Sequence, residues 1–151
     1  MRDGQGSTAD PRLIESEERY RAVIDNASDM IQSVRPDGSF EFVNPAWLRT
    51  LGYAADEIAE LNVWDVIHPD SLVHCQELFA QAISGEPLQN IRATFKTKAG
   101  APVPIEGGVT SRFVAGNVVA THGFFRDISG RLRAQELEER NVRLEREKQA
   151  R

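Results

Sequence analysis

The residues of this sequence best suited to covalent or metal chemistry are its single cysteine and its three histidines. A cysteine becomes a nucleophile when a base lies within hydrogen-bond reach of its sulfur. Cys75 and His74 are neighbours in a segment expected to be helical, where consecutive side chains point about 100° apart, so they do not form such a pair. Cys75, His68, His74 and His122 also lack the paired spacing of metal ligands, and we predict no metal site.

Carboxylates and glycines give no clearer sign of catalysis. Asp65, Asp70 and Asp127 do not form a recognisable pair for acid–base work. We expect Asp127 to accept backbone N–H bonds where the last strand meets the final helix. Gly107-Gly108 lies within a predicted strand, and we interpret it as a bulge rather than a phosphate-binding loop. We therefore predict that the protein is not an enzyme, and a small enzyme with a catalytic acid in a cavity remains the alternative.

Large apolar side chains are the remaining candidates for a binding site. The residues that could line an internal cavity are Trp47, Trp64, Phe79, Phe95, Ile105, Phe124 and Phe125. The simpler interpretation is that they form the hydrophobic core and bind nothing. A small organic ligand in the cavity is the alternative, and we expect no visible absorption band from the purified protein.

The overall composition, 40% hydrophobic and 27% charged, is typical of one globular domain with an extension. The net charge of −5 argues against a nucleic-acid-binding surface. No apolar run approaches the roughly 18 residues of a membrane span. A lone cysteine fits a reducing compartment, so we expect a cytoplasmic protein without membrane insertion.

The elements expected to position these residues begin with a helix over residues 10–27, after a tail (1–9) predicted to be disordered. Asp10-Pro11 is a typical helix start. The apolar stripe of this helix consists of Leu13, Tyr20, Ile24 and Ala27. Two strands (30–34 and 40–43) follow, and then helical segments at 46–51, 56–60, 63–67 and 69–84.

The last third of the domain alternates apolar and polar residues in three strands, which start near residues 91, 103 and 118. Pro102 and Pro104 predict an edge position for the fourth strand. Five strands with small helices between the second and the third predict an α+β domain with one antiparallel sheet. Its predicted core is 28–129.

A series of short motifs then suggests a family. They are Glu18-Arg19-Tyr20-Arg21, Pro36-Asp37-Gly38, Val43-Asn44-Pro45-Ala46, Leu51-Gly52-Tyr53, Ile67-His68-Pro69-Asp70, Lys98-Ala99-Gly100 and Arg126-Asp127-Ile128-Ser129. In order and spacing over residues 17–129, they resemble the PAS domain, a sensory module of signalling proteins. The resemblance implies a five-stranded antiparallel sheet, helices packed on one face, an enclosed cavity, and sensing rather than catalysis.

The resemblance also allows the cofactors of other PAS domains to be tested. Flavin-binding relatives use a cysteine in an Asn-Cys-Arg motif, and the corresponding stretch here, 61–65, has none. Flavin-binding relatives also contact the flavin ring with a glutamine on the last strand and with a second amide-bearing strand residue. The corresponding positions here are Phe125 and Ile105. The haem-ligating histidine is replaced by Gln76, and His74 lies on the outer face. We predict no cofactor, and an unknown small ligand remains open.

We expect the final helix (130–151) to pass the signal from the domain to an output domain. Arg126, Asp127, Ile128 and Ser129 resemble the motif that ends the last strand of a PAS domain and begins an outgoing helix, so we expect them to relay the signal. A heptad assignment places Ala134 and Asn141 at position a, with Leu137 and Leu144 at d. It predicts a parallel homodimer that acts on an output domain, as in two-component systems. A solvated linker helix, and an interaction module that binds no ligand, are the alternatives.

Overall fold

The computed structural model describes residues 10–150, so the tail predicted to be disordered, residues 1–9, lies outside them. The strands are β1 (Met30–Val34), β2 (Phe40–Val43), β3 (Leu88–Lys96), β4 (Pro102–Val114) and β5 (Asn117–Asp127). The α-helices are α1 (Pro11–Asn26), α2 (Pro45–Leu51), α3 (Leu72–Ile83) and α4 (Ser129–Gln149). Three short 3₁₀ helices, η2 (Ala55–Glu60), η3 (Val63–Val66) and η4 (Pro69–Ser71), connect α2 to α3.

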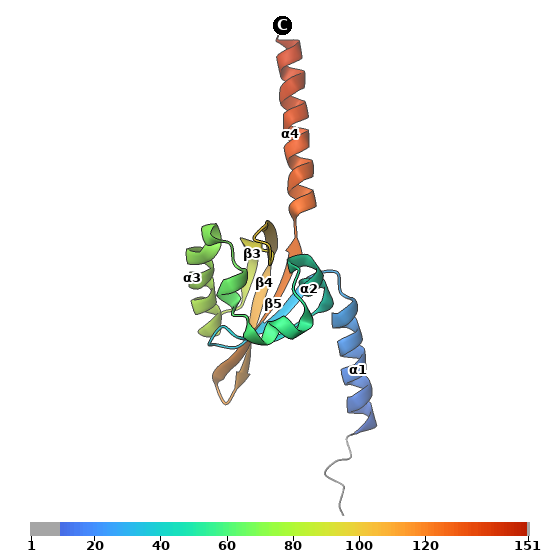
Figure 1. Ribbon diagram of the computed structural model, residues 1–151, viewed down its shortest axis with the longest axis vertical. Helices are drawn as coiled ribbons and strands as arrows, with labels where there is room; N and C mark the ends of the chain where they lie inside the picture. Colours follow the sequence, from blue (N-terminus) through green and yellow to red (C-terminus); the bar gives the residue numbers. More distant parts are fainter. Residues whose placement is uncertain (1–9, 151) are drawn as a thin grey trace, which may run out of the picture.

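The strands form one antiparallel sheet in the order β2-β1-β5-β4-β3. The segment from α2 to α3 covers one face, here called the inner face (Figure 1). The C-terminal half of α1 lies against the opposite, outer face. The predicted α+β fold with five antiparallel strands is therefore confirmed.

The predicted edge position of the fourth strand is wrong, because β4 lies between β5 and β3. Its prolines are tolerated because β5 pairs with β4 only from Ile105, opposite Asp127, onward. Pro102 and Pro104 come before Ile105 in β4, so β5 does not pair with them. The carbonyl of Pro104 faces the β5 side, where it accepts a hydrogen bond of 3.0 Å from the N–H of Ile128. The prolines therefore occupy a local edge within an inner strand.

Gly107-Gly108 lies in a strand as predicted, but the bulge is in the neighbouring strand. Residues 89–90 of β3 lie opposite the single residue Gly108. The glycines are needed because neighbouring backbones approach them closely. A Cβ on Gly107 would overlap the carbonyl oxygen of Phe124, and a Cβ on Gly108 would lie 2.9 Å from that of Leu88.

The buried side chain of Asn44 joins three elements. Its Oδ1 accepts hydrogen bonds from the N–H groups of Ile31 (3.0 Å) and Trp47 (3.1 Å). Its Nδ2 donates to the carbonyls of Ile24 (3.1 Å) and Asp29 (3.0 Å). Asn44 therefore caps α2 and fixes the C-terminal end of α1 beside β1.

The helical segments begin and end close to the predicted residues. Gly52 ends α2 with φ of 84°, in the left-handed region that glycine favours. The segments predicted at 56–60 and 63–67 are 3₁₀ rather than α-helical, and the one predicted at 69–84 is a 3₁₀ turn followed by α3.

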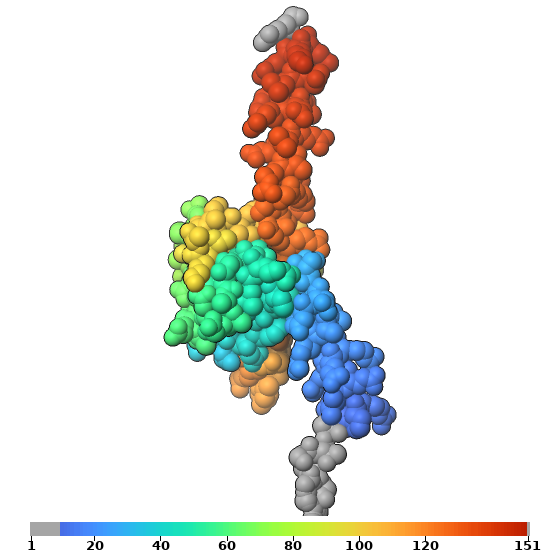
Figure 2. All heavy atoms as spheres, turned by 45° about the vertical axis from the view of Figure 1, so that its right-hand side comes forward, coloured from blue at the N-terminus to red at the C-terminus, as the bar shows by residue number. Residues whose placement is uncertain are grey.

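Two helices project from the domain in opposite directions (Figures 1 and 2). Neither α1 nor α4 contains a buried residue. Asp10 accepts a hydrogen bond from the N–H of Arg12 and caps α1, as predicted. Within residues 10–150, no helix has the length and apolarity needed to cross a membrane.

Candidate functional site

A cavity of about 60 Å³ lies between α3 and the inner face of the sheet. Its walls come from β1, β3, β4, β5, η3 and α3, so it touches most of the core. Five of the seven residues predicted to line a cavity lie around it: Trp64, Phe79, Phe95, Ile105 and Phe125. The rings of Phe95 and Phe125 meet edge to face at 5.2 Å, and those of Trp64 and Phe79 at 5.3 Å.

Two aromatic residues predicted for the cavity do not line it. Trp47 is completely buried on the α2 side of the core, against the rings of Phe40 (5.2 Å) and Tyr53 (5.9 Å). Phe124 is exposed on the outer face, because side chains alternate along β5 and the neighbouring Phe125 points inward.

Two polar residues of the cavity wall, Gln32 and Thr121, were not identified from the sequence. Gln32 is 6% exposed and Thr121 is 4% exposed. The sequence could have indicated that Gln32 points inward, because alternation along β1 places its side chain on the same face as those of Met30 and Val34. The Nε1–H of Trp47 donates a 3.0 Å hydrogen bond to Oε1 of Gln32.

The cavity does not fit a flavin or a haem. Its volume is below half of the roughly 150 Å³ that holds benzene in an apolar protein cavity. Gln76, at the position where haem-binding relatives have a histidine, is exposed on α3 rather than facing the cavity. The residues around the cavity therefore match neither cofactor.

Cys75 faces the cavity, but its surroundings make it a poor nucleophile. Burial raises the pKa of its thiol to about 11, so the thiolate is rare at neutral pH. His74 is exposed and does not face it. His68 accepts a hydrogen bond from the N–H of Asp70 and caps η4. Among residues 10–150, no cluster of three or more histidine, cysteine and carboxylate residues could hold a metal ion.

The four residues predicted to relay a signal form the junction between β5 and α4. Asp127 accepts hydrogen bonds from the N–H (2.9 Å) and the hydroxyl (2.6 Å) of Ser129, the role that the sequence predicted. Ile128 is buried. Arg126 pairs with Asp29 at 3.5 Å. The junction is thus held by a buried side chain and by polar contacts on both sides of it.

Glu106 on β4 attaches the first turn of α4 to the sheet. Arg131 donates to its Oε1 at 3.2 Å, and Arg92 of β3 donates to its Oε2 at 3.0 Å. These bonds, with that from Arg131 the stronger influence, lower the pKa of Glu106. The carboxylate therefore stays ionised and links α4 to two neighbouring strands.

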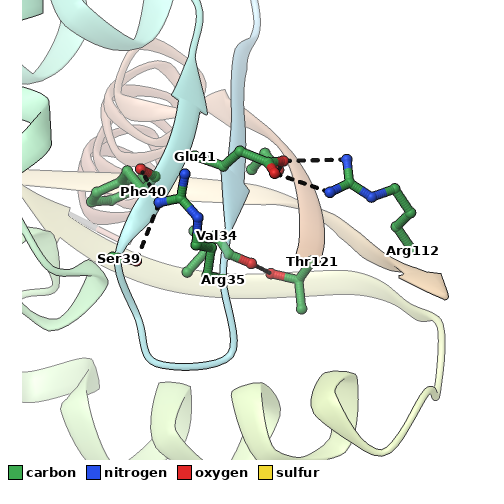
Figure 3. Close-up of polar contacts among 8 residues, drawn as sticks. Val34, Arg35, Ser39, Phe40, Glu41, Arg112 and Thr121 are labelled. Carbon is green, nitrogen blue, oxygen red and sulfur yellow. Dashed lines mark hydrogen bonds and ion pairs between the residues drawn. The ribbon is translucent and has the colours of Figure 1, made fainter. Parts of the chain in front are cut away.

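A second polar cluster crosses the outer face (Figure 3). Glu41 of β2 accepts hydrogen bonds from Arg112 of β4 (2.9 and 3.3 Å) and from the hydroxyl of Ser33 (2.7 Å). The bond from Arg112 is the largest cause of the lowered pKa of Glu41. Glu41, Arg112 and His122 all line a groove between α1 and the outer face of the sheet. Burial in this groove and the charge of Arg112 lower the pKa of His122. The cluster joins strands that are not neighbours in the sheet.

The four residues predicted to form a dimer seam, Ala134, Leu137, Asn141 and Leu144, lie along α4. Leu137 is 57% exposed and Leu144 is 47% exposed. The last strand of the cavity wall (β5), the junction and α4 thus follow one another along the chain. The cavity wall and the predicted seam are on different elements.

Comparisons with known proteins agree with this arrangement. A family model of the PAS fold matches residues 18–128. A methyl sulfide methyltransferase-associated sensor from Methanosarcina acetivorans is 30% identical over 125 residues, which are 82% of this chain and 12% of the sensor. An uncharacterised protein from Sinorhizobium fredii is 28% identical over 125 residues, 82% of this chain and 15% of that protein. The chain therefore spans less than a sixth of the length of either relative.

Among solved structures, a domain of a sensory box sensor histidine kinase/response regulator from Geobacter sulfurreducens matches with a TM-score of 0.63 and 27% identity. The match covers 76% of this chain and 96% of that domain. The similar region is thus the five-stranded domain, and it occurs in proteins described as sensors.

Proposed function

Since this chain belongs to the PAS family, we propose that it is the non-catalytic sensory module of a signalling protein. In this proposal it forms a parallel homodimer through α4 and passes a signal from its cavity, or from a bound partner, to an output domain. Its similarity to a sensor and to a domain of a sensor kinase supports a role in sensing.

The observation that carries the proposal is the course of β5. Thr121 and Phe125 of this strand line the cavity, and the same strand leads through Asp127 and Ile128 directly into α4. A change in the position of Phe125 would therefore act on α4 through only three intervening residues. Population shift toward a second arrangement of this junction is the physical form such a signal would take.

The exposed seam of α4 supports dimerisation. Leu137 and Leu144 are large apolar side chains on a helix that, among residues 10–150, contacts the rest of the chain only at its base. Asn141 at position a favours a parallel, in-register pair. Arg140 at g would lie opposite Glu145 at e of the second helix, so the flanking charges attract. Three heptads are short, so other contacts between the domains would have to contribute.

The size of the cavity favours a second candidate function. About 60 Å³ is far below the roughly 300 Å³ of the smallest usual ligand pockets. A module that binds only proteins would need no ligand, and its outer face offers exposed apolar side chains for such contacts. Retention of a small molecule by the native protein, measured by mass spectrometry, distinguishes the two functions.

The dimer is tested with Leu137→Asp combined with Leu144→Asp. We expect the dissociation constant of the dimer, measured by analytical ultracentrifugation, to rise at least about tenfold, because charges would replace the apolar seam. Val142→Asp, which introduces a charge at an outward position of the same helix, should leave it nearly unchanged. Circular dichroism should show that the domain remains folded in each variant. An unchanged dissociation constant in the double variant would remove the coiled coil from the proposal.

A further inference from the structure

The amide of Gln32 is a feature of the cavity wall that packing does not explain. A Trp N–H can only donate, so the atom of Gln32 that faces Nε1 of Trp47 at 3.0 Å must be its oxygen. The NH₂ group is therefore on the other branch of the amide. Within the part of the chain that the structure describes, residues 10–150, no hydrogen bond from this NH₂ group is found. Gln32 is 94% buried and lines the cavity, so water does not freely satisfy these donors.

The remainder of the wall is mostly apolar, and among residues 10–150 no charged side chain contributes to it. Apart from Gln32, its polar members are Thr121, whose hydroxyl donates a long 3.4 Å bond to the carbonyl of Val34, and Cys75. The high pKa of Cys75 keeps its thiol neutral. A carboxylate, phosphate or ammonium group entering the cavity would lose its hydration without gaining an opposite charge. The electrostatics therefore select an uncharged occupant.

From these observations we infer that the cavity binds a small uncharged molecule whose hydrogen-bond acceptor receives the NH₂ group of Gln32. The inference rests on the proposed function, because it assigns the chemical class of the signal that the cavity receives. By proportion with benzene in a cavity of about 150 Å³, the present volume holds about two or three non-hydrogen atoms. Small ethers, aldehydes and neutral amides of this size fit the class.

Entry is provided by the side of the cavity nearest solvent. Trp64 and Phe79, which pack edge to face at 5.3 Å, are only partly buried, whereas Phe95, Ile105 and Phe125 on the sheet are buried. We expect rotation of the two partly buried rings to open the cavity without breaking a strand pair, because they lie on η3 and α3. The polar end at Gln32 lies on the sheet, so the acceptor of the ligand points inward.

The test uses three molecules of nearly the same shape with the whole chain. Dimethyl ether is neutral and carries an acceptor, formate is charged, and propane is neutral without an oxygen. Binding is followed by the NMR shifts of methyl groups that line the cavity, on Val34, Ile91 and Ile105. The exposed methyl groups of Val23 and Val73 report any general effect of the added molecule.

Dimethyl ether should shift the cavity methyl groups saturably and leave the exposed ones unchanged, and formate should bind at least about 30-fold more weakly. Gln32→Leu should weaken dimethyl ether binding about tenfold and leave the affinity for propane unchanged or higher. Retained binding of propane shows that the variant still forms the cavity. Gln76→Leu makes the same chemical change on the exposed side of α3 and should alter neither affinity.

The inference is overturned if formate binds as tightly as dimethyl ether, if no probe binds the wild-type protein, or if Gln32→Leu affects the two neutral probes equally. Comparison of the probes on the wild-type protein decides the question even if Gln32→Leu does not fold. Dimerisation through α4 is measured separately with the Leu137 and Leu144 variants. The inference can therefore fail while the proposed dimer stands, or the reverse.

Discussion

The carboxylate of Glu41 receives two hydrogen bonds from Arg112 on the outer face of the sheet (Figure 3). The hydroxyl of Ser33 donates a third. These bonds favour the ionised form, and for that reason the pKa of Glu41 is below its ordinary value of 4.5. A lowered pKa in the folded state means that ionised Glu41 stabilises the fold above about pH 4.5. That stabilisation is lost as the pH falls through the lowered pKa.

Glu41→Gln should therefore lower the free energy of unfolding by about 1 kcal/mol at pH 7, the upper range for a partly exposed ion pair with good geometry. Urea denaturation at pH 7 and at several acidic pH values measures the difference. It should shrink as the pH falls below about 4.5, because the wild-type side chain is then protonated and resembles glutamine. Glu77→Gln, on the exposed face of α3, is the control and should have no such effect. A difference that does not depend on pH would show that the charge of Glu41 contributes nothing.

At the scale of secondary structure, Gly107 and Gly130 differ in the space available for a side chain. Gly107 lies in the middle of the sheet, where a Cβ would overlap the backbone of Phe124. Gly130 lies in the first turn of α4, where a Cβ would meet no atom within 4 Å. The two sites differ in the space around the glycine, so the same substitution to alanine should have opposite effects.

Gly107→Ala should lower the free energy of unfolding by more than about 2 kcal/mol, because β4 and β5 must separate to admit the methyl group. Gly130→Ala should raise helix stability by up to about 1 kcal/mol, the difference between alanine and glycine in a helix. Denaturation curves measure the first effect. The helix content of the protein, measured by far-ultraviolet circular dichroism, reports the second. Equal effects of both substitutions would contradict the contacts described for β4 and β5.

Elements with local sequence signals could be predicted, and contacts between distant strands could not. Gly52 and Asp10 mark helix ends through their own backbone preferences, and the structure has those ends. The prolines of β4 gave a wrong position because whether a strand is at an edge depends on where β5 ends. The bond between Trp47 and Gln32 joins residues 15 positions apart, so the polar end of the cavity was not visible in any one segment. The aromatic residues of the cavity wall and Ile105 were therefore predicted, whereas its polar residues Gln32 and Thr121 were missed.

At the scale of the whole molecule, the two projecting helices leave the domain in opposite directions (Figure 2). Within the described part of the chain, α4 is attached at its base, through the Asp127 turn and the Arg131–Glu106 pair. A helix fixed only at its base follows the position of the strand that carries it. In a parallel dimer, both bases would lie at the same end of the coil, so a movement of either β5 strand would change how the two helices meet.

A parallel, in-register dimer can be tested by disulfide formation between identical positions. Ala134→Cys and Asn141→Cys place a thiol at position a, where facing Cα atoms of a parallel pair are close enough for a disulfide. Both variants should form cross-linked dimers on mild oxidation at least about tenfold faster than Arg143→Cys, which faces outward on the same helix. Nonreducing gel electrophoresis measures the rates. The native Cys75 is buried, and its pKa of about 11 keeps it a thiol, so the wild-type protein should form no such dimer.

Two positions are needed because an antiparallel pair centred near Asn141 would also bring that residue opposite itself. The same pair would place Ala134 opposite residue 148, and Ala134→Cys would then not cross-link. Cross-linking at both positions therefore requires the parallel arrangement. Equal rates for Ala134→Cys, Asn141→Cys and Arg143→Cys would show that α4 has no preferred seam, and the signal would then have to leave the domain through another surface.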